Sequence, residues 1–267
     1  MITAAAPAPQ RAPASVLTST GTITARNLRR LTRVPTLIAL ATIQPVLLVL
    51  LFTYAFGGAV HVPGMSRYID YLLPGIVVLA IGFGASQTGV AIAEDLASGM
   101  IDRFRSLPIT GTAVLAGRVA ADAVRNLGVV VLMAGAGSAI GFRFHAGPGA
   151  ALTAAALAVA VGTVFSWLNM LLGLLVRNPE AAGLAGLFPI IILTFTSSTL
   201  VPVATMPGWL QAFARANPVT AMAGALRALC LGGPTARPVI ETLAWLAGIL
   251  AVTIPAAISR YRHATTA

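Results

Sequence analysis

Six long runs of apolar residues, separated by short polar segments, occupy most of the chain after residue 34. A helix needs about 20 such residues to cross a bilayer. Only 9% of the 267 residues are charged, whereas soluble domains carry about 25%. The chain is therefore predicted to be an all-α integral membrane protein with one transmembrane domain, residues 35–260. The predicted spans are 35–56, 71–93, 127–141, 150–176, 181–201 and 239–258.

The two ends of the chain differ from this domain. Residues 1–14 are rich in Ala and Pro and are predicted to be a disordered leader. Residues 15–34 place apolar residues on one side of a helix and arginines on the other, which predicts an amphipathic helix on the membrane surface. The alternative is an ordinary basic flank that orients the first span. The arginines are Arg26, Arg29, Arg30 and Arg33. Residues 261–267 are predicted to be a cytoplasmic tail.

Arginine placement predicts the orientation. All 17 basic residues are Arg, which is typical of a GC-rich bacterial genome, and the formal net charge is +10. They are scattered between the spans, so the charge indicates topology and no nucleic-acid partner. With the N-terminus inside, twelve arginines fall in inner segments and five in outer ones. Both termini are therefore expected on the cytoplasmic side of the cell membrane.

Residues 202–238 are too apolar for a plain loop and too interrupted to form a span. They predict two short re-entrant helices in the outer leaflet, beginning near Pro207 and Pro218, with the second ending at Gly232. Trp209 suits a lipid–water interface. The alternative, a seventh span, would put the C-terminus outside and leave Arg227 in lipid.

The spans hold few groups that could do chemistry. Asp70, Glu94 and Glu241 fall at predicted span ends, and the amides inside are Gln44, Gln87 and Asn169. Intramembrane enzymes and proton-driven carriers usually place titratable groups at mid-membrane. There is no GxxxxGK[ST] phosphate loop. The single cysteine and three separated histidines predict no metal site. We expect no enzyme activity and no cofactor on this chain, so the energy for transport must come from another polypeptide.

Residues 93–126 carry four of the seven acidic residues of the chain. Within them, Leu96, Met100, Phe104 and Leu107 form one apolar stripe at helical spacing, and Pro108 ends the helix. Such a helix fits a groove on a soluble partner. The alternative is that the charged residues of this segment only form a solvated cap on the ends of two helices. Further on, Arg118, Asp122 and Arg125 are spaced for helical ion pairs that lead into the third span.

These residues resemble the signature loop of ABC-2-type permeases, in particular those of the daunorubicin/doxorubicin-resistance (DrrB/DrrC-like) branch. The resemblance rests on Glu94, Asp95, Gly99, Arg103, the run from Ser106 to Ile109, Gly117, Arg118 and Asp122. Later strings also match: GFRFH at 141–145, RNPE at 177–180, and ANPV with ALRAL between 216 and 229.

The resemblance implies a permease that works with two copies of a separate ABC ATPase, which binds ATP and Mg, and with a second permease, identical or a sister subunit. It also implies that the loop between spans two and three contains a coupling helix, which seats in the ATPase. We expect this contact to involve Glu94, Asp95, Leu96, Met100, Asp102, Arg103, Phe104, Arg105, Leu107 and Pro108. The surface helix at residues 15–34 is expected to contact the ATPase too.

In such permeases, spans two and five line the substrate path. This places Phe83, Gln87, Leu193, Phe195, Thr196 and Ser197 on the path. Their aromatic, hydroxyl and amide groups suit a drug or lipid cargo. The function expected is ATP-driven export of a hydrophobic or amphipathic compound from the membrane. The alternative is an ion-coupled secondary carrier using Asp70 and Glu241; almost nothing supports a membrane enzyme or assembly factor.

Overall fold

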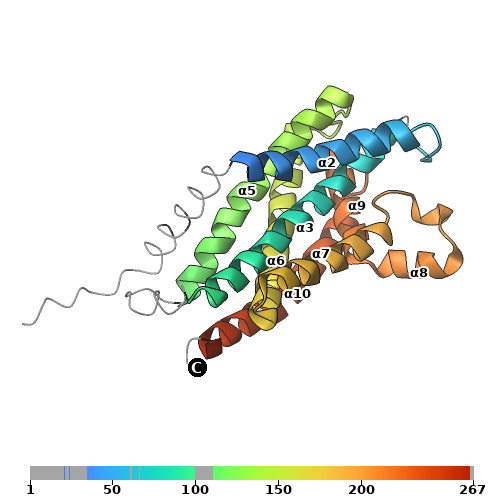
Figure 1. Cartoon of the computed structure of the whole chain (residues 1–267). Coiled ribbons are helices and arrows are strands. Elements are labelled where there is room, and N and C mark those ends of the chain that lie inside the picture. The colour runs from blue at the N-terminus through green and yellow to red at the C-terminus, as the bar shows by residue number, and fades with distance from the viewer. Residues whose placement is uncertain are drawn as a thin grey trace, which may run out of the picture.

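The computed structural model describes residues 21, 24, 35–60, 62–65, 67–99 and 111–264. Every regular element among them is a helix (Figure 1). In chain order these are α2 (Pro35–Phe56), α3 (Tyr68–Ala97), α5 (Gly111–Ile140), α6 (Gly147–Val176), α7 (Pro179–Phe195), the 3-10 turn η1 (Val203–Thr205), α8 (Gly208–Ala216), α9 (Pro218–Leu231) and α10 (Ala236–Ala264).

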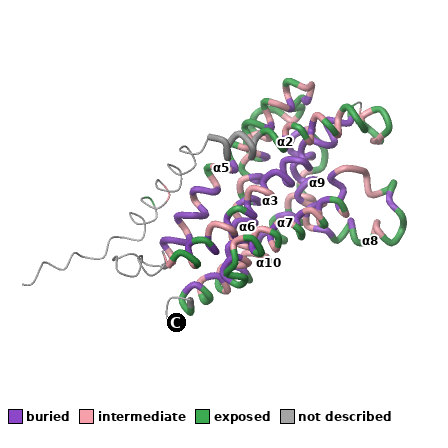
Figure 2. Tube along the Cα trace, viewed as in Figure 1, coloured by how far each residue is buried: buried purple, intermediate pink, exposed green. Residues whose placement is uncertain are grey.

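Helix α3 forms the centre of the bundle. It packs against α2, α5, α6, α7 and α9, and its residues are almost all buried from Tyr68 to Gly82 (Figure 2). Gly82, Gly89 and Gly75 allow this close approach, because a Cβ at each would overlap atoms of Ile190, Asn169 and Thr199. Small residues at helix crossings are the usual means of packing inside a membrane.

Four helices in the described part of the chain are long and apolar enough to cross a membrane: Tyr68–Ala97, Thr112–Ile140, Gly147–Val176 and Ala236–His263. Shorter apolar helical stretches accompany them: Ile43–Phe56 within α2, Pro179–Phe195 and Pro218–Leu231. The prediction of an all-α integral membrane protein is confirmed. Helix α2 has the bounds of the first predicted span, 35–56, and the fifth predicted span falls on the 17-residue α7; the six-span count stays a prediction.

Two helices differ in length from the predicted spans. Helix α5 begins at Gly111, well before the predicted start at Leu127, because the Ala-rich run after Gly111 is helix-forming and its charges find partners on the neighbouring helix α3. Helix α7 ends at Phe195, short of the predicted Val201. There the Ser197 hydroxyl donates to the carbonyl oxygen of Thr194 and the chain turns.

The segment between α7 and α10 holds two short helices, α8 and α9, separated at Asn217. The Asn217 side chain caps α9 by accepting from the Val219 amide. Gly232 ends α9 with a φ of 90°, a conformation that favours glycine. Helix α8 lies at the opposite end of the bundle from the C-terminus (Figure 1). Whether these two helices enter the outer leaflet stays a prediction.

Candidate functional site

The candidate site lies where α3 ends and α5 begins, at the end of the bundle that holds the C-terminus (Figure 1). Here a second apolar cluster, separate from the main core, joins α3, α5, α6 and α10. Its buried members are Ile92, Val114, Leu115, Val119, Met170, Leu174, Ala257 and Tyr261. The expected coupling segment therefore leaves and re-enters the bundle beside a packed base.

A buried ion pair joins the two helices within this base. Arg118 Nη2 lies 2.7 Å from Asp95 Oδ2, and each side chain is at most 10% exposed. Asp95 is on the last turns of α3 and Arg118 is two turns into α5, so the pair closes the chain segment between them. Tyr261 of α10 is buried next to the pair. Nearby, the Thr24 hydroxyl donates to the Gly117 carbonyl oxygen at 3.1 Å, which brings Thr24 to the same place.

The other expected coupling residues fall in two groups. Glu94 is exposed, and Leu96 is half-buried against the second apolar cluster. Outside the described residues lie Met100, Asp102, Arg103, Phe104, Arg105, Leu107 and Pro108, together with the arginines of the N-terminal surface helix, Arg26, Arg29, Arg30 and Arg33.

The first residue of the predicted apolar stripe lies at the end of a helix. Helix α3 ends at Ala97, and Gly99 adopts a left-handed φ of 66°. Leu96 therefore lies on the last turn of α3, which glycine helps to end because it takes a left-handed conformation at no steric cost. The rest of the predicted stripe lies outside the described residues and stays a prediction.

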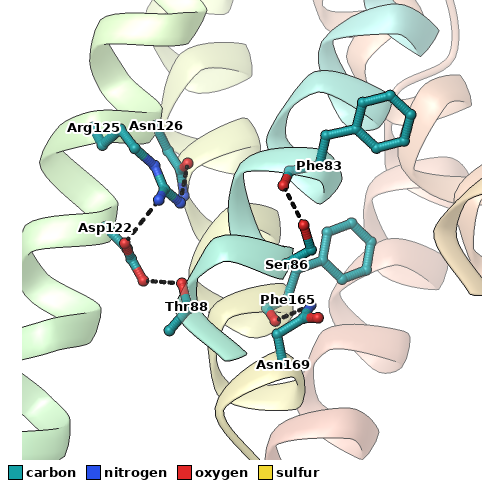
Figure 3. Close-up of polar contacts among 8 residues, drawn as sticks. All are labelled: Phe83, Ser86, Thr88, Asp122, Arg125, Asn126, Phe165 and Asn169. Carbon is teal, nitrogen blue, oxygen red and sulfur yellow. Dashed lines mark hydrogen bonds and ion pairs between the residues drawn. The ribbon is translucent and has the colours of Figure 1, made fainter. Parts of the chain in front are cut away.

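A polar group lies deeper in the bundle, between α3 and α5 (Figure 3). The Thr88 hydroxyl donates to Asp122 Oδ2 at 2.5 Å, and Arg125 Nη1 lies 3.1 Å from Asp122 Oδ1. Arg125 Nη2 also donates to Asn126 Oδ1 at 3.5 Å. All of these α5 residues lie inside the candidate span Thr112–Ile140. They precede Leu127, where the third span was predicted to begin, so the expectation that the spans hold few titratable groups stays a prediction.

On the other side of α3, Asn169 of α6 occupies a tight crossing of three helices (Figure 3). Its Nδ2 donates to the Phe165 carbonyl oxygen at 2.9 Å. Its Oδ1 faces Gly186 of α7, where a Cβ would overlap it, and Ser86 of α3 is close by. Asn169 was expected only as one of three amides in the spans, and the crossing gives it a packing role.

The expected path residues do not all share one surface. Phe83 and Leu193 are half-buried against the main core. Gln87 and Phe195 are exposed, and the Phe195 side chain is 57% exposed. Phe83 points away from the Asp122 group (Figure 3). Thr196 donates to the Ile192 carbonyl oxygen, and Ser197 is buried within the turn after α7. Their assignment to a substrate path stays a prediction.

Sequence reasoning missed two features of the bundle. It expected Arg118, Asp122 and Arg125 to pair with one another along one helix, whereas the structure buries Arg118 and Asp122 against α3 and leaves Arg125 partly exposed. The available signal was their i, i+4 and i+3 spacing in an Ala-rich run that is long enough to continue the third span. It also counted Arg227 among the five arginines of outer segments, on a predicted re-entrant helix, without predicting that its guanidinium is buried among protein atoms.

Comparison with known proteins gives a consistent result. The family model for the ABC-2 type transporter matches residues 18–231. A daunorubicin resistance ABC transporter permease protein of Streptomyces coeruleorubidus is 33% identical over 221 residues, covering 83% of this chain and 78% of that protein. A probable doxorubicin resistance ABC transporter permease protein of Mycobacterium tuberculosis is 29% identical over 227 residues, covering 85% and 82%.

Proposed function

The chain belongs to the ABC-2 type transporter family and is the permease subunit of an ABC exporter, and from this premise we propose how it receives energy. An amphipathic coupling helix in the segment 98–110 contacts the ATPase partner. The Asp95–Arg118 pair fixes the two ends of that segment to α3 and α5. Movement of the segment is therefore passed to the transmembrane helices instead of being lost in a loose loop.

The single observation that carries this proposal is the burial of that ion pair. An exposed ion pair contributes about 0–1 kcal/mol to stability and does little to fix the helices that it joins. A buried pair is strongly coupled, because removing one partner leaves an uncompensated charge in a medium of low dielectric constant. A rigid base under the segment is what transmission of a mechanical displacement requires.

The remaining parts of the assembly are proposed from the family. Two copies of a separate ABC ATPase bind ATP and Mg, and a second permease, identical or a sister subunit, completes the path. Both termini lie in the cytoplasm of what we infer to be a GC-rich bacterium. An ion-coupled carrier is less well supported, because its candidate carboxylates already form ion pairs. Asp70 Oδ2 lies 3.3 Å from Arg67 Nε, and Glu241 Oε1 lies 2.8 Å from Arg237 Nε.

The cargo is proposed to be a hydrophobic or amphipathic compound. The relatives are named for resistance to daunorubicin and doxorubicin, so we propose drugs of this kind as the first compounds to test, with membrane lipid as the second class. The six predicted path residues, Phe83, Gln87, Leu193, Phe195, Thr196 and Ser197, would contact it along α3 and the end of α7.

Phe104→Ala is expected to weaken association with the ATPase about tenfold or more, because a groove-filling aromatic side chain is removed. Co-purification of the ATPase with the tagged permease measures the effect. Phe213→Ala is the matched control, since Phe213 is an exposed aromatic on α8. It should leave co-purification unchanged. Equal ATPase recovery from Phe104→Ala and wild type would contradict the coupling assignment.

The two short helices, α8 and α9, are proposed to lie in the outer leaflet. Trp209 is 77% exposed on α8 and Phe213 lies one turn later on the same side. We expect tryptophan fluorescence of a variant retaining only Trp209 to be quenched by lipids that carry a spin label near the headgroup. A variant that retains only Trp245 of α10 provides the comparison. Quenching of Trp209 by water-soluble iodide alone would place α8 outside the membrane.

A further inference from the structure

Arg227, on α9, is buried at the end of the bundle away from the C-terminus. Its side chain donates four hydrogen bonds: Nε to the Tyr71 carbonyl oxygen at 2.7 Å, Nη1 to Ser198 Oγ at 3.2 Å, and Nη2 to the carbonyl oxygens of Ser198 and Thr199 at 2.6 and 3.1 Å. Its Cζ also lies 3.7 Å from the centre of the Tyr71 ring. One side chain thus joins α9, the start of α3 and the turn after α7.

The chemistry of these partners is unusual for a buried cation. No carboxylate forms an ion pair with Arg227 in the described part of the chain. A buried charge is normally paired with an opposite charge, because desolvation is costly. Here carbonyl dipoles and an aromatic face take that role. Such a cation is expensive to bury, so a role beyond packing is expected of it.

The turn of residues 197–200 receives further bonds from the same side. The Tyr71 hydroxyl donates to the Ser198 carbonyl oxygen at 2.6 Å, and the Tyr68 hydroxyl donates to the Leu200 carbonyl oxygen at 2.7 Å. Thr199 rests on Gly75 of α3, where a Cβ would overlap it. We define the outer cluster as Arg227, Tyr71, Tyr68 and the turn 197–200.

A second contact ties α9 to the end of α7. Asn217, which caps α9, donates through Nδ2 to the Leu193 carbonyl oxygen at 2.7 Å. The last turn of α7 and the start of α9 are therefore bound directly. Any separation of α3 from α7 at this end must break bonds of the outer cluster or carry α9 along with one of them.

We propose that Arg227 is a positioning residue of the transport cycle, which holds the ends of α3, α7 and α9 together until the path opens outward. The proposal rests on the proposed function, in which α3 and α7 line the path. Arg227 bonds to α3 through one guanidinium nitrogen and to the turn through the other two. The planar arrangement of these three nitrogens is therefore needed to hold both elements at once. A lysine ammonium offers its donors from one point and cannot reach both sides equally well.

The chain contains its own reporter for this opening. Cys230 is the only cysteine in the sequence, and it lies three residues after Arg227 on the same helix. Its residue is 8% exposed, and its carbonyl oxygen accepts from the His145 amide at 3.0 Å. A membrane-impermeant maleimide added from outside should label Cys230 slowly while the outer cluster is closed.

The experiment compares labelling rates of Cys230 in the full permease–ATPase complex in proteoliposomes. Without nucleotide, Arg227→Lys should label about tenfold faster than wild type, the effect of losing one hydrogen bond to a charged group. Arg215→Lys on α8, an exposed arginine bonded to Gln211, is the matched control and should label at the wild-type rate. Trapping with ATP and vanadate should speed labelling of wild type but add little to Arg227→Lys.

The unfolding temperature of each variant separates positioning from simple stability. If Arg227 only supported the fold, Arg227→Lys would lower that temperature, and its labelling would still rise with ATP and vanadate as in wild type. That result, or wild-type labelling of Arg227→Lys without nucleotide, overturns the proposal. Should Arg227→Lys fail to assemble, Tyr71→Phe removes one bond to the turn and should give a smaller rise. If Arg227→Lys labels faster but the wild-type complex shows no ATP-driven transport, the proposed function is overturned, whereas the positioning of α3, α7 and α9 by Arg227 is not.

Discussion

Arg118→Ala is expected to destabilise the permease by about 3–5 kcal/mol, because it leaves the Asp95 carboxylate buried without its partner. The measurement is thermal unfolding of the purified protein in detergent. The ATPase activity of the assembled complex should fall as well, since the base of the segment 98–110 is loosened. Loss of this one side chain should therefore reduce both stability and coupling.

Two variants sharpen this expectation. Arg237→Ala is the matched control, because its ion pair with Glu241 is on the surface, and little change is expected. The double variant Asp95→Ala with Arg118→Ala should be more stable than Arg118→Ala alone, since no charge is then left buried. If Arg118→Ala is no more harmful than Arg237→Ala, the pair does not fix the base of the segment.

Gly186→Ala is expected to disturb the crossing of α3, α6 and α7, with a cost of about 1–3 kcal/mol from overpacking. A Cβ on Gly186 would overlap Asn169 Oδ1 and would come within 3.2 Å of Ser86 Cβ. The backbone of α6 is also closely packed on α3, because a Cβ on Gly173 of α6 would overlap the carbonyl oxygen of Gly89 of α3. Thermal unfolding in detergent and the yield of the assembled complex measure the effect.

Because the overlap is with one side-chain atom, a second substitution should relieve it. Asn169→Ala combined with Gly186→Ala should recover much of the lost stability. Gly128→Ala is the control, since a Cβ there meets no atom within 4 Å; in a helix it should be neutral or slightly stabilising. A Gly186→Ala protein as stable as Gly128→Ala would mean that the crossing is looser than described.

The apolar pattern was sufficient for the fold class and for most helix positions. Runs long enough to cross a bilayer cannot be satisfied in water, so their number and spacing predict a helical membrane domain. The breaks before α8 and α9 were also predictable, because proline begins helices and Gly232 ends one. These features depend on residues that are close in the sequence, so they could be predicted without the folded structure.

Features that depend on contacts between distant helices were not predictable in the same way. The extent of α5 before Leu127 could not be fixed from the sequence, because charged residues are typical of a loop until α3 supplies their partners, as it does for Arg118 and Asp122. The burial of Arg227 was not predictable from its place on a re-entrant helix, because its partners, Tyr71 and the turn at Ser198, are far away in the chain. Pairing across such separations needs the folded structure.

Export through this permease is expected to be driven by ATP hydrolysis on a partner chain. The decisive measurement is uptake of doxorubicin into inside-out vesicles that contain the permease and its ATPase partner. We predict uptake that requires ATP, stops with vanadate and persists when a protonophore collapses the proton gradient. Uptake that continues in the presence of vanadate and is abolished by the protonophore would contradict ATP-driven export and indicate an ion-coupled carrier.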